Sequence, residues 1–377
     1  MKGTRITAVS IILVALVISW VSGLSFQRMH EPEPIIPGPG VTSIKMLSEY
    51  YPHLAGTAGD TEIYVLEGPK PGGSMLVLGG NHPNEPASML TAVVLIENAV
   101  LEAGTLYVIP RANNSAFTHN DPQEGHPQRF TIQTPGGERW FRFASRATNP
   151  IHQWPDPDVY IHASSGQQLS GSETRNLNRT FPGRTGGTFT ERISYGIVQL
   201  IQAEEIDVSI DLHEASPEYP VVNAVVAHDR GMGIASQVVM NLQFEGMPIG
   251  LEPSPVNLRG LTHRELGDHT DTLAFLLETT NPAQGRLRGK TNEALVLTGI
   301  DPGYVRAQQM GRLFVPYDDT GHPLDDRVAR HVASVTEFSI IFSETFPDKP
   351  IQISQLDGYH DMIRNGLGAY LRSPNTN

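Results

Sequence analysis

The feature that most constrains the fold is a set of short apolar runs that alternate with helical patterns. Candidate buried strands lie at 74–80 (SMLVLGG), 105–110 (TLYVIP), 207–212 (DVSIDL), 221–227 and 271–277 (DTLAFLL). Helical periodicity lies between them, at 87–102, 191–204 and 233–243. Near-continuous apolar strands separated by helices are typical of a largely parallel sheet covered on both faces. We therefore predict an α/β fold, a single domain with a mostly parallel mixed β-sheet flanked by helices.

Two other stretches have a different character. The segment 114–172 is rich in Pro, Gly, His and Asn and has no clear period, which predicts a long loop excursion over one face of the sheet. The C-terminal part is predicted to be helical, notably at 302–313 and 325–342. Because no internal repeat and no second linker follows, we expect one domain over 46–377.

The N-terminus has the pattern of an export signal or a membrane anchor. Lys2 and Arg5 precede a run at 6–24 that carries no charge and is long enough to cross a bilayer. We predict that residues 1–25 are a signal peptide or an N-terminal membrane anchor, and both alternatives stay open. The basic residues before the run place the body outside the cytoplasm, in the periplasm or the extracellular space. The Pro- and Gly-rich stretch that follows predicts a stiff tether over 26–45.

Composition excludes several classes of function. The net charge of −13 argues against a nucleic-acid partner, because such proteins need basic surface to displace phosphate counterions. The chain has no cysteine, which excludes disulfides, thiolate metal sites and cysteine nucleophiles. Any zinc here must therefore use His, Asp or Glu, the ligand set of hydrolytic zinc.

The first candidate metal ligands follow the run at 74–80. In GGNHPNEP, His82 and Glu85 are three residues apart where a strand gives way to a helix, so both can face one cation. The same spacing occurs by chance at His30 and Glu33 in the tether. Position separates the two pairs, because the carboxyl ends of parallel strands are where open α/β sheets place their sites.

Two further strand ends carry chemically useful side chains. In DLHEA, His213 can supply a third ligand, which leaves the fourth zinc position for water. Asp211, two residues earlier, is a candidate acceptor for an imidazole N–H. In LETTNP, Glu278 follows the run at 271–277, and we predict that it takes a proton from the attacking water and passes it to the leaving amine.

A fourth motif, RNLNRTFPG, offers a carboxylate-binding pair. An arginine grips a carboxylate with two parallel hydrogen bonds and an asparagine adds a third, so Asn178 and Arg179 are the predicted substrate clamp. Arg175 and Arg111 are further candidates for substrate binding. A single surface arginine is more often only a solvated charge.

Taken together, GGNHPNEP, NLNRTFPG, DLHEA and FLLETT resemble the zinc carboxypeptidase superfamily, and most closely its succinylglutamate desuccinylase/aspartoacylase branch. All four motifs occur in the family order. The resemblance implies one Zn²⁺ per chain on His82, Glu85 and His213, with Asn178 and Arg179 as the clamp and Glu278 as general base and acid.

The sequence departs from the family's pattern in three ways. Asn176 replaces the aspartate of the family's D-L-N-R motif, and the helical tail is more like that of the peptidases. No motif identifies a substrate-side tyrosine among Tyr304, Tyr317 and Tyr359.

The resemblance implies a zinc metallohydrolase that cleaves an amide bond next to a free carboxylate. One alternative acts on small peptides as a carboxypeptidase, which an exported chain favours. A second removes the acyl group of an N-acyl amino acid. A third is a non-catalytic relative that holds zinc or a carboxylated ligand without turnover.

Overall fold

A computed structural model describes residues 2–121 and 126–373 of the chain. Its centre is an eight-stranded sheet in the order β1-β2-β5-β3-β10-β13-β11-β12. In chain order the strands are β1 (Ser43–Met46), β2 (Glu62–Glu67), β3 (Ser74–Leu78), β5 (Thr105–Ile109), β10 (Val208–Ala215), β11 (Ala224–Ala227), β12 (Gly250–Pro253) and β13 (Leu273–Thr280).

The four strands at the centre of the sheet, β5, β3, β10 and β13, run parallel to one another. On one side β2 and β1 add antiparallel pairings, and on the other β11 pairs antiparallel with β13 and parallel with β12. The prediction of a mostly parallel mixed sheet is thus confirmed at the centre, where the candidate site residues lie. All side chains of β10 are buried, which explains its near-continuous apolar sequence.

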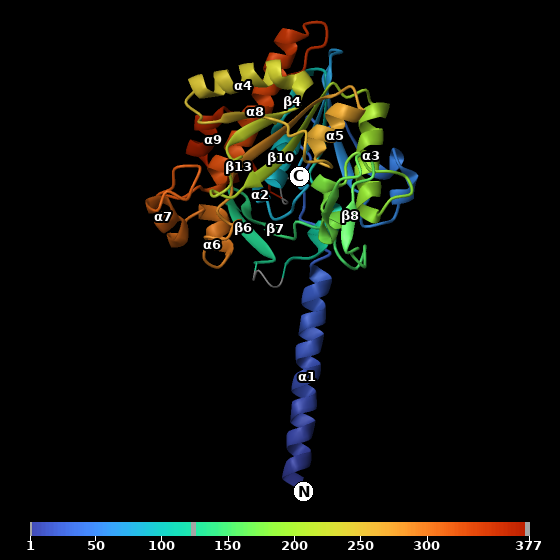
Figure 1. Cartoon of the computed structure of the whole chain (residues 1–377). Helices are drawn as coiled ribbons and strands as arrows, with labels where there is room; N and C mark the ends of the chain where they lie inside the picture. Colours follow the sequence, from blue (N-terminus) through green and yellow to red (C-terminus); the bar gives the residue numbers. More distant parts are fainter. Residues whose placement is uncertain (1, 122–125, 374–377) are drawn as a thin grey trace.

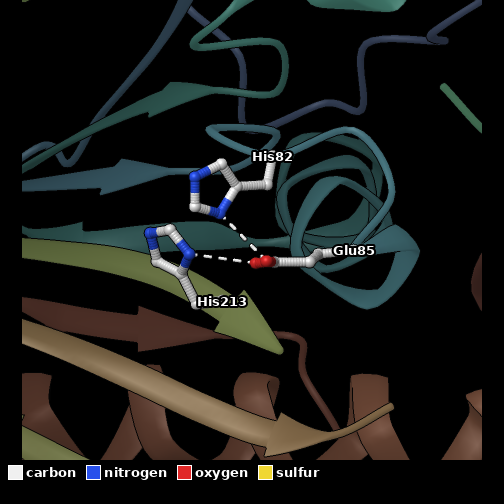
Figure 2. A group of neighbouring side chains, drawn as sticks. All are labelled: His82, Glu85 and His213. Carbon is white, nitrogen blue, oxygen red and sulfur yellow. Dashed lines mark hydrogen bonds and ion pairs between the residues drawn. The ribbon is translucent and has the colours of Figure 1, made fainter. Parts of the chain in front are cut away.

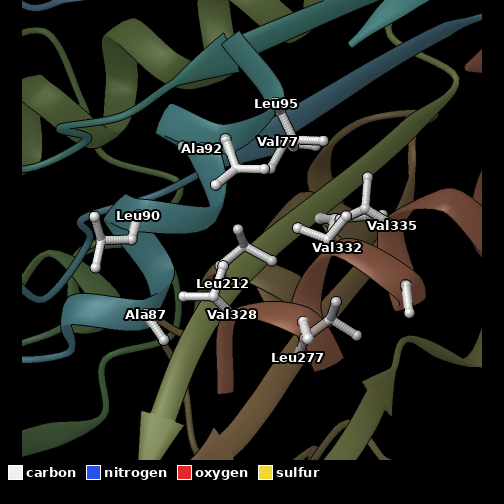
Figure 3. Close-up of a cluster of buried hydrophobic side chains, with 14 of the residues drawn as sticks. Val77, Ala87, Leu90, Ala92, Leu95, Leu212, Leu277, Val328, Val332 and Val335 are labelled. Carbon is white, nitrogen blue, oxygen red and sulfur yellow. The ribbon is translucent and has the colours of Figure 1, made fainter. Parts of the chain in front are cut away.

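Helices cover both faces of this sheet (Figure 1). One face packs against α2 (Pro86–Asn98), α4 (Met232–Phe244) and α8 (Leu324–Thr345), and α9 (Tyr359–Asn365) packs against α8. The other packs against α3 (Phe189–Ala203) and α5 (Thr262–His269). Figure 3 shows the first core, in which aliphatic side chains of α2 and α8 meet those of β3, β10 and β13. The molecule is therefore a three-layer α/β/α domain with a core on each side of the sheet.

The amino-acid pattern of α8, the longest helix of the body, explains why it forms a helix and which face it buries. In α8, Val328, Val332, Val335, Phe338 and Phe342 recur every three or four residues and are buried, while Asp325 and Asp326 stand in its first turn. The remaining helices of the tail are α6 (Glu293–Thr298) and α7 (Pro302–Gln309). The prediction of a helical tail agrees with this arrangement, apart from the short strand β14 (Gln352–Ser354), which pairs with β4 (Val100–Ala103).

The segment 114–172 is more structured than the sequence predicts. It holds two antiparallel hairpins, β6 (Arg129–Thr134) with β7 (Gly137–Arg142), and β8 (Val159–Ile161) with β9 (Gln168–Ser170). In β6, apolar and polar residues alternate over only six positions (RFTIQT). So short an alternation is hard to separate from a loop in so polar a context.

Residues 2–28 form α1 (Lys2–Arg28), an apolar helix that projects from the body and is long enough to span a membrane (Figure 1). The segment predicted as a tether, 26–45, differs from the expectation because it packs onto the body. Glu33 is buried and its Oε1 lies 3.3 Å from Arg111 Nη1. At Gly38 a Cβ atom would lie 2.2 Å from the backbone oxygen of Glu97, so only glycine permits this close approach to α2. Glycine and a buried ion pair thus fix a stretch whose composition suggested a free spacer.

Candidate active site

The chain leaves β3 through a tight turn that delivers the first two candidate ligands. Gly80 has a φ of +63°, and a side chain there would meet Phe117 and the carbonyl oxygen of Pro110. His82 lies in the turn, and Glu85 is the residue just before α2, whose first position is Pro86. Both side chains are buried. The motif GGNHPNEP therefore encodes a turn that points two candidate ligands inward.

The carboxylate of Glu85 faces both imidazole rings (Figure 2). Its Oε1 is 2.9 Å from His82 Nδ1, and its Oε2 is 2.9 Å from His213 Nδ1. The ligand atoms of the three residues lie within 4.8 Å of one another. The structure thus brings together the His-Glu-His set from two separate motifs, the turn after β3 and strand β10.

Partners on the far side of each ring determine which nitrogen faces the centre of the group. Asn176 Oδ1 lies 2.8 Å from His82 Nε2, while Asn176 Nδ2 donates to Glu173 Oε2. Asp211 Oδ2 lies 2.8 Å from His213 Nε2. Both acceptors call for an Nε2–H, which leaves the two Nδ1 lone pairs facing the Glu85 carboxylate. Three converging electron-pair donors of this kind fit a divalent cation such as zinc.

Asn176, which stands where the resembled motif has an aspartate, is thus the hydrogen-bond partner of His82. A neutral amide oxygen accepts the His82 N–H as a carboxylate oxygen would. Despite the departure from that motif, His82 Nε2 therefore keeps an acceptor.

Glu278 lies directly beside His213. The two residues are register partners in the parallel pair β10–β13, so their side chains project from the same face of the sheet. Both strands run further than predicted, to Ala215 and Thr280, which places both residues inside strands and not just beyond their ends. Burial raises the pKa of the Glu278 carboxyl to about 8. A carboxyl group with this pKa can exchange a proton near neutral pH.

A cavity of about 580 Å³ opens over this group of residues. Its wall includes Glu85, His213 and Glu278 together with Asn178 and Arg179. Asn178 Oδ1 accepts from the backbone N–H of Thr262, which holds the side chain in place. Arg179 is held by a bond from Nη1 to the carbonyl oxygen of Asn178. The predicted clamp and the predicted base thus face one cavity.

Two predicted substrate-binding arginines do not line this cavity. Arg111 is buried between Glu33 and Glu62, and Arg175 makes a two-pronged ion pair with Asp156. Arg146 instead contacts the His82–Glu85–His213 group: its Nη1 lies 2.7 Å from Glu85 Oε1, and it lines the cavity. Sequence analysis missed Arg146 because it lies in the excursion 114–172, where no motif marks it.

The cavity wall also shows residues that no motif pointed to. Tyr219 lines it, whereas Tyr304, Tyr317 and Tyr359 are buried elsewhere with their hydroxyls bonded to Gln284, Gly299 and Asp326. His263 lines it as well, and of the residues that the structure describes none hydrogen-bonds its ring. Most of the remaining wall is aliphatic: Val221, Val226, Pro253, Pro255, Leu258, Leu261 and Leu276.

No protein-family model and no curated protein matches this chain. Among solved structures, it resembles an aspartoacylase family protein from Mesorhizobium loti, with 18% identity, a TM-score of 0.36, and 59% of this chain and 56% of that chain covered. It also resembles a succinylglutamate desuccinylase from Silicibacter, with 19% identity, a TM-score of 0.35, and 59% and 53% covered. A metallo-carboxypeptidase from Burkholderia cenocepacia is similar at 12% identity, a TM-score of 0.45, and 82% and 66% covered. The chain spans little more than half the length of the first two structures.

The likeness is to part of the fold, and the chemistry of the cavity rests on the geometry of this chain.

Proposed function

We propose that this protein is a zinc-dependent hydrolase that cleaves an amide bond next to a free carboxylate. The observation that carries the proposal is the register of β10 and β13, which sets Glu278 beside His213 at one end of the His82–Glu85–His213 group. A catalytic carboxylate next to an open metal site, in a cavity that also holds an arginine clamp, is the arrangement of hydrolytic zinc enzymes.

In this mechanism His82, Glu85 and His213 hold the zinc, which supplies polarisation of the scissile carbonyl and a lower pKa for the attacking water. Glu278 accepts a proton from that water on a carboxylate oxygen as the new C–O bond forms. It then donates the proton to the amide nitrogen as the C–N bond breaks. Asn178 and Arg179 hold the substrate carboxylate and thereby place the scissile bond. Arg146, whose Nη1 is 2.7 Å from Glu85 Oε1 and which lines the cavity, is proposed to stabilise the developing oxyanion, whereas Arg111 and Arg175 lie outside the cavity.

The substrate is proposed to be a small peptide that loses its C-terminal residue. The aliphatic side chains in the cavity wall favour a substrate with an apolar side chain. An N-acyl amino acid is the second candidate, because it presents the same carboxylate next to an amide. Hydrolysis of a panel of both classes distinguishes them. A protein that binds one zinc and cleaves neither would instead be a binding relative.

We further propose that α1 anchors the protein in a membrane with the body outside the cytoplasm. Support comes from Lys2 and Arg5 before the apolar run and from the full exposure of α1 in the structure. Fractionation of expressing cells tests this, since cleavage after α1 would release a soluble body whereas an anchor keeps the full chain with the membranes.

His82→Ala is expected to remove the metal. Losing one of three protein ligands should lower the zinc content from about one per chain to a small fraction after dialysis, and hydrolysis should fall with it. Metal analysis of the purified protein is the measurement. His269→Ala, at a half-exposed histidine outside the cavity, serves as the control and should keep its zinc. Full zinc content in the His82 variant would contradict the ligand assignment.

Arg179→Leu is expected to weaken binding of the substrate carboxylate. Losing charge-assisted hydrogen bonds worth about 1.5–3 kcal/mol should lower kcat/KM by roughly 10- to 100-fold. The effect should disappear when the substrate carboxylate is blocked as an amide, because the clamp then has no anion to hold. Arg184→Leu, an exposed arginine outside the cavity, is the matched control. Equal losses on free and blocked substrates would argue against a carboxylate clamp.

The value of kcat/KM should fall as the pH is lowered, because Glu278 becomes protonated. The carboxylate must be ionised to act as base, and burial raises its pKa from 4.5 to about 8. A bound Zn²⁺ lowers this pKa again, so kcat/KM should rise with pH through a midpoint between 4.5 and 8. A pH–rate profile recorded with saturating zinc measures this midpoint. A profile that is flat from pH 4.5 to 8 would count against Glu278 as the base.

A further inference from the structure

The end of α1 is held firmly against the body. Arg142 and Arg129 each donate from Nη2 to the carbonyl oxygen of Arg28, the last residue of α1, at 2.9 and 3.0 Å. Arg142 also donates to the carbonyl oxygen of Glu31 at 2.9 Å, and Met29 is buried. These contacts leave no free spacer between the helix and the hairpin β6–β7, so the position of α1 fixes the position of the body.

The length of α1 sets the level of this junction in a bilayer. The uncharged run 6–24 rises about 28 Å at 1.5 Å per residue, close to the ~30 Å hydrocarbon thickness of a membrane. Arg28 follows about 6 Å further along, which is the depth of the headgroup layer on one side. The part of the body that contacts residues 28–31 therefore lies at the height of the lipid headgroups.

Large apolar side chains are exposed at this same place. The ring of His30, two residues beyond α1, makes an edge contact with His152 at 6.4 Å between centroids. On either side of His152, Ile151 is 71% exposed and Trp154 is 72% exposed. The strand β8 adds the exposed side chains of Val159 and Ile161, and it lies on the side of the body from which α1 projects (Figure 1). In water these side chains would remain hydrated, whereas a headgroup layer accepts tryptophan in particular.

We propose that the body lies on the bilayer that α1 crosses, with Ile151 and Trp154 inserted among the lipid headgroups. The partner is the lipid surface and not a second protein, because the helix fixes the height of these side chains at the headgroup layer. This inference rests on α1 spanning the membrane and is independent of the hydrolase reaction. It changes the expected arrangement from a body on a tether to a body seated on the membrane.

The absence of cysteine from the sequence makes a clean test possible. Single variants Trp154→Cys and Ile151→Cys of the full chain are labelled with a nitroxide and reconstituted in phosphatidylcholine–phosphatidylglycerol vesicles. Electron paramagnetic resonance then compares collisions of the label with oxygen, which partitions into lipid, and with a water-soluble nickel chelate. Phe244→Cys is the matched surface control, because Phe244 is 88% exposed at the last position of α4, a helix on the side of the body opposite α1 (Figure 1). Leu16→Cys reports on α1 itself.

We expect the labels at 151 and 154 to have a higher ratio of oxygen to nickel collisions than the label at 244. The ratio at 16 should be higher still. If 16 is in lipid while 151 and 154 match 244, α1 spans the bilayer but the body stands away from it, and the proposal is wrong. If 16 is also in water, α1 does not span the bilayer and the proposal fails at its premise. Both replaced side chains are exposed, so their loss leaves the core intact.

Discussion

Replacing Glu278 with glutamine should abolish most turnover and leave the metal in place. The amide has nearly the same shape as the carboxyl but cannot accept the proton of the attacking water. Loss of a general base costs about 10²- to 10⁴-fold in kcat. Zinc content should stay at the wild-type level, because Glu278 is not one of the three residues whose ligand atoms converge. Steady-state kinetics with metal analysis on the same sample measures both quantities.

The same substitution at Glu252 provides the control. Glu252 lines the cavity but is exposed and lies on β12, away from the register position beside His213. Glu252→Gln should therefore leave kcat close to the wild-type value, far from the loss expected for Glu278→Gln. Activity of the wild-type level in Glu278→Gln would refute the mechanism. Loss of zinc from that variant would instead make Glu278 a ligand, a different site from the one proposed.

Much of this fold could be predicted because it is encoded locally. Four apolar runs became the parallel centre of the sheet, β3, β5, β10 and β13, close to their predicted bounds. Their ends were harder to place. His213 and Glu278 are polar, so the apolar pattern stops at them, although the backbone continues to pair for two further residues in each strand. Polar residues that serve a site interrupt the signal that identifies a strand.

The candidate site was predictable where side chains lie next to a strand or a turn in the sequence. His82, Glu85, His213 and Glu278 all have this property. The partners of the arginines could not be predicted in this way, because they depend on contacts between segments that are distant in the sequence. Arg111 meets Glu33, from the predicted tether, and Arg146 reaches Glu85 from a segment without a motif. His30 and Glu33 match the ligand spacing only by chance. Glu33 instead has a structural role, as the buried partner of Arg111.

The largest loss of stability is expected from Arg327→Met. Arg327 and Glu214 form an ion pair at 2.7 Å in which both side chains are completely buried. Glu214 Oε2 also accepts from the backbone N–H of Ala87, so the pair joins α8, β10 and the start of α2. Removing one partner leaves a buried charge without compensation, which costs about 3–5 kcal/mol. Urea unfolding of the full chain in detergent should show this loss.

A double variant separates the charge from the packing. Arg327→Met with Glu214→Gln removes both charges and keeps an amide oxygen for the Ala87 N–H, so it should be more stable than Arg327→Met alone. The exposed pair Arg364–Asp361 is the control, and Arg364→Met should change stability by less than about 0.5 kcal/mol.

Because side chains alternate along β10, His213 faces the cavity while Glu214 faces α8. The backbone N–H of Glu214 donates to Glu85 Oε2 at 3.0 Å, so the strand that the buried pair secures carries His213 and holds Glu85, two of the three candidate metal ligands. A fall in zinc affinity in Arg327→Met, restored in the double variant, would show that the fold and the site depend on the same pair.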